Sequence, residues 1–183
     1  MKHYAICSNR FSFSIAPLFL VLGLSFSANS LATTPTNSVE IRTAINLSWF
    51  SGNYQHIETS LLTQDTDSVL PLINTLGEIW LQRDGAISGE VSPLLAQAII
   101  MHPEVTLAVL SSHPNSYQKW VERELNGMLF TAQTDKEKLE LEMLQGSLAG
   151  ALADYIPTAN TQLKPYAQSL LTAVEASNIR IVD

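Results

Sequence analysis

Apolar residues recur at helical spacing through almost the whole chain beyond residue 37, and this periodicity limits the possible folds more than any other feature. Such spacing places apolar side chains on one face of an α-helix, which must then be buried against another element. Strand-like alternation is nearly absent, apart from a possible extended tail at residues 179–182. The pattern predicts an all-α fold, either a compact orthogonal helical bundle of about seven short helices or, alternatively, a short α-helical repeat array.

Breaking and capping residues predict the helix boundaries in the first half of the chain. Asn37 or Ser38 is expected to cap a first helix, which Ser51-Gly52-Asn53 should end. Residues 84–91, with two glycines, are expected to form a loop. Ser92-Pro93 then has the pattern of a cap followed by the first residue of a helix.

In the second half, two His-Pro steps are expected to separate short helices, because a residue that precedes proline disfavours helical angles. These steps are His102-Pro103 and His113-Pro114. Thr134 and Glu137 have the spacing of a capping box and predict the start of the longest helix, which should end near residue 156. Its apolar stripe consists of Leu141, Leu144, Leu148, Leu152 and Tyr155.

Residues 1–32 have the pattern of a cleavable signal peptide. Lys2 and Arg10 precede an apolar stretch, and the small residues Ser30 and Ala32 stand three and one positions before the expected cleavage site. An uncleaved anchor is the alternative, although the densest apolar run is only about half of the roughly 20 residues that span a membrane. We therefore expect residues 33–183 to be a single helical domain, exported to the periplasm or secreted, in a bacterium.

The composition of residues 33–183 excludes several functional classes. Cys7 is the only cysteine and lies in the predicted signal, so the remaining chain is cysteine-free and offers no thiol catalysis, disulfide or cysteine-ligated zinc. Loss of Lys2 and Arg10 changes the formal net charge from −7 to −9. An acidic domain without clustered Lys or Arg is not expected to bind nucleic acid or anionic membrane surfaces, and no membrane span is expected after cleavage of the signal.

The two His-Pro steps supply the weak candidates for a functional surface, namely His102, Glu104 and His113. If residues 103–112 are helical, the two histidines lie about 16 Å apart along the axis, too far to share a metal ion. Each histidine is instead expected to be a helix cap, with Glu104 in the first turn of its helix. The sequence therefore predicts no metal site and no cofactor, and it identifies no catalytic residue.

Three further patterns have structural interpretations. Small residues around Gly146 and Gly150 predict that another helix packs very close to this one. The charge run at residues 135–142 is expected to be a solvated helix face, with an acidic patch for a basic partner as the alternative. Trp49, Trp80 and Trp120 are expected in the core.

No known catalytic motif is complete. Ser116 and Lys119 form a Ser-x-x-Lys pattern, but its companion motifs are missing. The leading hypothesis is a non-catalytic periplasmic protein that binds a macromolecule, such as an inhibitor, immunity or adaptor-like protein. One alternative is a cell-envelope hydrolase, which would hold Glu104 or another acid with a raised pKa in a cleft. The other is a carrier of a small apolar ligand, with a pocket lined by some of the tryptophans. The sequence does not indicate the oligomeric state.

Overall fold

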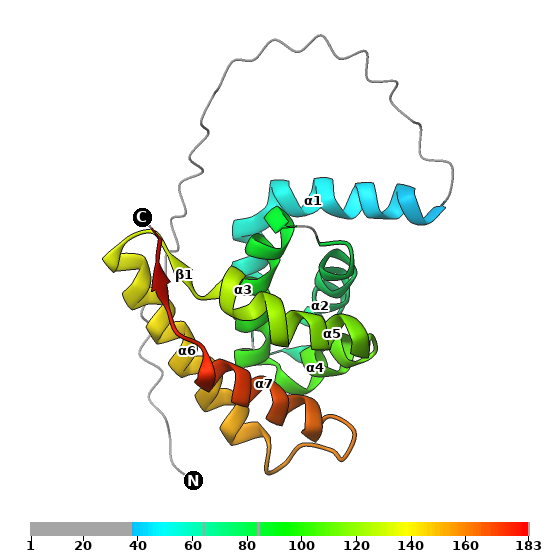
Figure 1. Ribbon diagram of the computed structural model, residues 1–183. Helices are drawn as coiled ribbons and strands as arrows, with labels where there is room; N and C mark the ends of the chain where they lie inside the picture. The colour runs from blue at the N-terminus through cyan, green and yellow to red at the C-terminus, as the bar shows by residue number, and fades with distance from the viewer. Residues whose placement is uncertain (1–37, 64, 84, 183) are drawn as a thin grey trace. The chain divides into compact units, whose positions relative to one another are not determined.

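A helix that is buried over most of its residues between 91 and 99 organises the structure. This helix is α3 (Gly85–Met101), and α1 (Ser38–Ser60), α2 (Thr66–Leu81), α4 (Pro103–Ser111) and α6 (Asp135–Tyr155) all pack against it (Figure 1). The computed structural model describes residues 38–182, apart from residues 64 and 84. The predicted signal peptide lies outside these residues.

The described residues form an all-α compact bundle, which confirms the predicted fold class. After α4, a turn at Ser112 and His113 leads into α5 (Pro114–Lys119), which continues directly into the π-helix η1 (Trp120–Leu129). Helix α7 (Lys164–Ala176) packs on both α6 and η1. The only strands in the described part are β1 (Thr131–Ala132) and β2 (Arg180–Ile181), which pair in parallel and confirm the predicted extended tail.

The sequence of α3 explains its central position. A helix that is apolar around most of its circumference is most stable when several other helices cover it. Seven residues of its C-terminal half are fully or almost fully buried: Val91, Ser92, Leu94, Leu95, Ala96, Ala98 and Ile99. The Trp120 indole N–H donates to the Ser92 hydroxyl over 3.1 Å, so the polar group among these residues has a partner.

Two predicted helix boundaries were wrong. The predicted loop at residues 84–91 is helical from Gly85, so Ser92 is an interior residue and not a cap. Pro93 is tolerated inside α3, although its missing N–H removes one helical hydrogen bond. The free energy of burying Val91 and its apolar neighbours therefore outweighs the local signal of the Ser-Pro step.

The predicted break at Ser51-Gly52-Asn53 does not occur either, because α1 continues to Ser60. The Ser51 hydroxyl and the Asn53 side-chain amide donate to the carbonyls of Leu47 and Trp49, four residues earlier. These polar groups therefore bond within the helix and do not compete with its backbone. The apolar stripe of α1 also runs across the expected break, since Phe50, Ile57 and Leu61 are buried.

The predicted starts at the two His-Pro steps and at the capping box are confirmed. His102 and His113 are the N-caps of α4 and α5, each followed by proline in the first turn. The Thr134 hydroxyl accepts a hydrogen bond from the Glu137 N–H over 3.2 Å at the start of α6. The Glu137 carboxylate accepts from the Gln133 N–H over 2.7 Å, one residue earlier than in a standard capping box.

The close helix contact expected at Gly146 and Gly150 lies elsewhere. Both glycines are exposed, and a Cβ built on either meets nothing within 4 Å. The close approach is instead between α2 and α4, where a Cβ on Gly77 would overlap Cγ1 of Val109. The prediction of a close contact at Gly146 and Gly150 was therefore wrong.

This contact generates a test. Gly77→Ala should lower the free energy of unfolding by about 1–3 kcal/mol, because the added methyl overlaps the Val109 side chain, whose χ1 is restricted in a helix. Chemical denaturation monitored by circular dichroism measures the change.

The matched control is Gly52→Ala, because Gly52 is an exposed helical glycine with open space where a Cβ would be. It should raise the free energy of unfolding by about 0.5–1 kcal/mol, as expected from helix propensity. A stabilising Gly77→Ala would contradict the packing between α2 and α4 described above.

Candidate functional site

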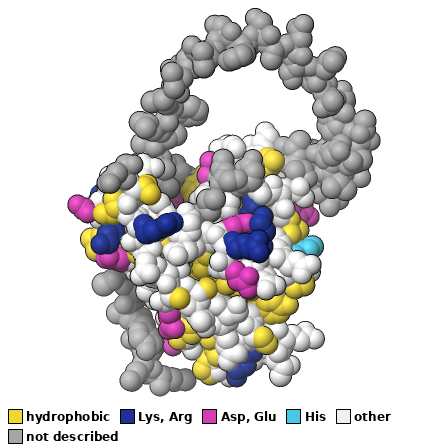
Figure 2. Space-filling model, viewed as in Figure 1, with side chains coloured by type: hydrophobic (Ala, Val, Ile, Leu, Met, Phe, Trp, Pro, Cys, Tyr) yellow, Lys and Arg dark blue, Asp and Glu magenta, His cyan; other side chains and the backbone are white. Residues whose placement is uncertain are grey.

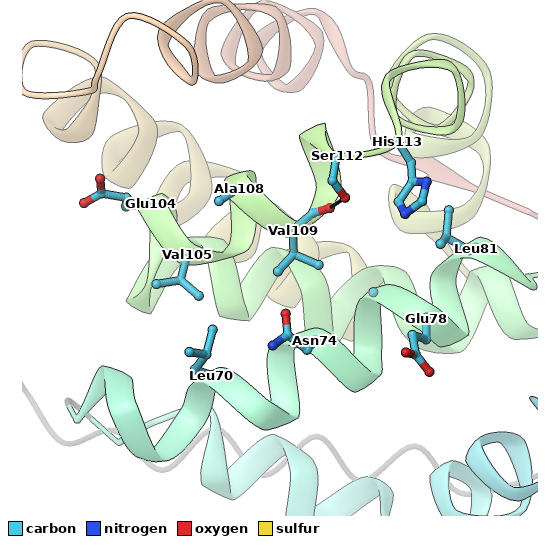
Figure 3. A pocket seen from close by; sticks show the side chains of 11 residues that line it. Leu70, Asn74, Glu78, Leu81, Glu104, Val105, Ala108, Val109, Ser112 and His113 are labelled. Carbon is cyan, nitrogen blue, oxygen red and sulfur yellow. Dashed lines mark hydrogen bonds between the residues drawn. The ribbon is translucent and has the colours of Figure 1, made fainter. Parts of the chain in front are cut away.

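A shallow open groove of about 700 Å³ lies between α2 and α4 (Figure 3). Leu70 and Val105 lie toward the end at Glu104, Ala108 and Val109 line the middle, and Leu81 lies toward the opposite end. Leu70 is 39% exposed, one of few large apolar side chains in the described chain that protrude to this extent. The groove therefore presents an apolar surface to solvent.

The close approach of α2 and α4 sets the depth of this groove. Gly77 lines the groove where Val109 sits against the backbone of α2. The helices consequently meet below the groove, and no deep cavity forms between them. An arrangement of this kind suits an elongated ligand that lies on the surface, and it does not enclose a small molecule.

Polar Asn74 lies opposite Val109 between the two ends of the groove, and the titratable side chains lie at the ends. Glu104 lies at one end, and Glu78 and His113 lie at the other (Figure 3). Because α4 separates Glu104 from His113 by nine residues, the two ends are about 14 Å apart. The structure therefore brings Glu104 and His113 into one surface, although it leaves them far from each other.

The two carboxylates differ in their surroundings. The Asn46 side-chain amide donates to Glu78 over 2.9 Å, which ties this end of the groove to α1. Glu104 is exposed, and within the described chain its carboxylate forms no hydrogen bond or ion pair. The phenol of Tyr155 on α6 lies close to it: burial, and then the charge of Glu104, raise the pKa of Tyr155. Glu104 is thus the carboxylate of this groove that is most available to a ligand.

His102, the third candidate, does not belong to the groove. It is 5% exposed, and its Nε2–H donates to the Thr63 carbonyl over 2.8 Å. Its Nδ1 lies 3.4 Å from the Thr66 hydroxyl. These contacts connect the loop before α2 to the start of α4, so His102 positions the two helices that form the groove and does not face a ligand.

Arg83, which the sequence did not single out, fixes the end of α2. Its guanidinium lies over the Trp80 ring, with Cζ 4.5 Å from the centroid, and its side chain is 4% exposed. It donates to Glu124 over 2.6 Å and to the Ser116 hydroxyl over 2.9 Å. These bonds hold the C-terminal end of α2 against α5 and η1, next to Leu81 and the second end of the groove.

This network also accounts for the Ser-x-x-Lys pattern. The Ser116 hydroxyl accepts from Arg83, and the Lys119 Nζ lies 3.0 Å from the second carboxylate oxygen of Glu124. Both side chains are therefore engaged with other partners. The pair does not form the serine–lysine arrangement that acyl transfer requires.

The two alternative functions gain no support from this geometry. Burial raises the pKa of Glu58, but this residue lies on α1 and outside the groove. The carboxylates of Glu78 and Glu104 lie at opposite ends of the groove. Their separation is larger than the roughly 5–10 Å between the paired carboxyl groups that catalyse glycoside hydrolysis. No tryptophan lines the groove, since Trp80 and Trp120 are fully buried and pack edge to face in the core.

Two further observations limit what the described residues can do. No three of their His, Cys, Asp or Glu side chains gather in a group that could hold a metal ion. Among the helices of the described ranges, none has the length and apolar character needed to cross a membrane.

Comparison of the chain with protein-family models, curated proteins and solved structures found no match.

The ion pair of Arg83 predicts a pH dependence of stability. Partial burial alone would raise the pKa of Glu124, but hydrogen bonds from Arg83 and Lys119 outweigh it and hold the pKa below its usual value. The stabilisation is thus fully present above the unfolded-state pKa of a glutamate and is lost as the pH falls through the lower folded-state pKa.

Glu124→Gln should therefore destabilise the protein by about 2 kcal/mol at neutral pH and by progressively less toward about pH 3. Urea unfolding across this range measures the difference from the wild type. Glu175→Gln, an exposed position on α7, serves as the control and should change little at any pH. A penalty for Glu124→Gln that stays constant across the range would refute the assignment.

Proposed function

We propose that this protein binds another protein without catalysing a reaction on it, and that the groove between α2 and α4 is the docking site. The observation that carries the proposal is the exposed apolar strip of Leu70, Val105 and Ala108, with a carboxylate at each end. Exposed apolar surface bounded by polar residues is typical of interaction sites. The predicted signal peptide and acidic charge support a partner in the bacterial periplasm, as for an inhibitor, immunity or adaptor-like protein.

The occupant that fits this groove is a short amphipathic helix of the partner. The backbone groups of α2 and α4 are hydrogen-bonded within their own helices, so the groove walls offer no strand edge to an extended segment. A helix supplies its own backbone hydrogen bonds and needs only apolar side chains for the strip. The spacing of about 14 Å between the ends corresponds to about ten helical residues, or three turns.

The charges of the groove indicate that this helix is basic at its ends. Glu104 is exposed and has no charged partner within the described chain, while Glu78 lies at the far end. The net charge of the whole chain, −7, adds a long-range attraction for a basic partner. Lys or Arg near each end of the helix would meet these carboxylates, and a central acidic residue would be excluded from the apolar strip.

Selection from a displayed library of random peptides tests this proposal. The protein should enrich helical sequences with apolar residues at positions i, i+4 and i+7 and with Lys or Arg at the ends. Leu70→Glu should weaken the best peptide by about tenfold or more, because it replaces an exposed apolar side chain of the strip with a charge. Glu104→Lys should weaken it by a smaller factor that decreases at high salt.

Each variant has a matched control outside the groove. Leu62→Glu changes a leucine that is 56% exposed, and Glu175→Lys reverses an exposed charge on α7. Neither should alter binding of the peptide. Peptides that bind Leu70→Glu and the wild type equally would exclude the groove as the docking site, and enrichment of acidic sequences would exclude the basic helix as its occupant.

A further inference from the structure

The outward face of α6 has a row of exposed apolar and small residues that has no partner within the described chain. Leu139 is 58% exposed and Met143 is 43% exposed, and both lie on the side of α6 that faces away from the bundle. One and two helical turns further along, the same face continues with Gly146 and Gly150 and then with Ala153, all exposed. Over the first half of α6, acidic, basic and hydrophobic side chains lie side by side on the surface (Figure 2).

The two glycines have no structural role inside this chain. Glycine in a helix interior costs about 1 kcal/mol relative to alanine. At Gly77 a close contact with Val109 accounts for this cost, whereas Gly146 and Gly150 have open space where a Cβ would be. Their positions beside two protruding apolar side chains are explained if a helix of a different molecule approaches this face.

We propose that this face is a homodimer interface in which α6 packs antiparallel against α6 of a second copy. The order of side-chain sizes along this face indicates that its partner is a second copy of the same chain. Bulky residues occupy the N-terminal half of the face and small residues occupy the C-terminal half. A two-fold axis between positions 146 and 147 places each bulky half on a small half, so the face is complementary to itself.

This axis fixes the residues that meet. Met143 of one copy lies opposite Gly150 of the other, and Leu139 lies opposite positions 153 and 154 of the other copy. The contacts extend over 15 residues, which is about 22 Å of helix. Without side chains at Gly146 and Gly150, the two helices can approach closely enough for Met143 to fill the space over the opposite backbone.

The charges of the face match the same arrangement. Lys136 lies at the bulky end, is 83% exposed and is only loosely paired with Glu140, at 3.5 Å. Asp154 lies at the small end, is exposed and has no ion pair among the described residues. In the antiparallel pair, Lys136 of each copy comes within side-chain reach of Asp154 of the other. A parallel pair would instead place Lys136 next to Lys136.

An interface of one helix per copy is at the small end of the range for specific complexes, so the dimer should dissociate at roughly micromolar concentration. Sedimentation equilibrium of the purified protein over a concentration series measures this. Gly150→Leu should weaken dimerisation by about tenfold or more, because it fills the space for Met143. The same substitution should leave the monomer at least as stable in thermal unfolding, since leucine favours the helix more than glycine does.

Gly52→Leu is the matched control, because Gly52 is also an exposed helical glycine with open space around it. It should leave the dimer unchanged. Lys136→Glu and Asp154→Lys should each weaken the dimer, and the double variant should restore it. A wild-type protein that stays monomeric to about 1 mM would overturn the proposal, as would a dimer that Gly150→Leu and both charge reversals leave intact.

Discussion

Burial of most residues between 91 and 99 of α3 is the constraint on which the rest of the bundle depends. Residues 91–99 carry apolar side chains around most of the helix circumference, so neighbours must cover them from several directions. Five helical elements do so: α1, α2, α4, α6 and η1. Because α2 and α4 both pack on α3 and also on each other at Gly77 and Val109, their outer surfaces form the two walls of a groove. The candidate site is therefore a consequence of how the core is covered.

Features that are decided within one helical turn were predictable from the sequence. The starts of α4, α5 and α6 follow from proline geometry and from the hydrogen bond between Thr134 and Glu137, both of which are local. The predicted break at residues 51–53 and the predicted loop at residues 84–91 were wrong for a common reason. In both segments, the free energy of burying apolar side chains outweighs weak local preferences for a turn.

Contacts between distant residues were not predictable to the same degree. Arg83 follows the apolar stripe of α2 as a single cation, and nothing nearby in the sequence indicates that it pairs with Glu124, 41 residues later. Small residues indicated a close contact at Gly146 and Gly150, but the structure has that contact at Gly77. Of the three candidate residues, His102 is buried between α4 and the loop before α2, and only Glu104 and His113 face the groove.

The central claim is that the groove between α2 and α4 contacts another protein. Ala108 is exposed in the middle of this groove, whereas Gln168 is exposed on α7, outside the groove. A photo-reactive amino acid at either position, in cells that produce the protein, reports what lies against that surface. We expect one discrete cross-linked product from position 108 that Leu70→Glu abolishes, and none of the same mass from position 168. The same product from both positions, or no product from position 108, would contradict the account.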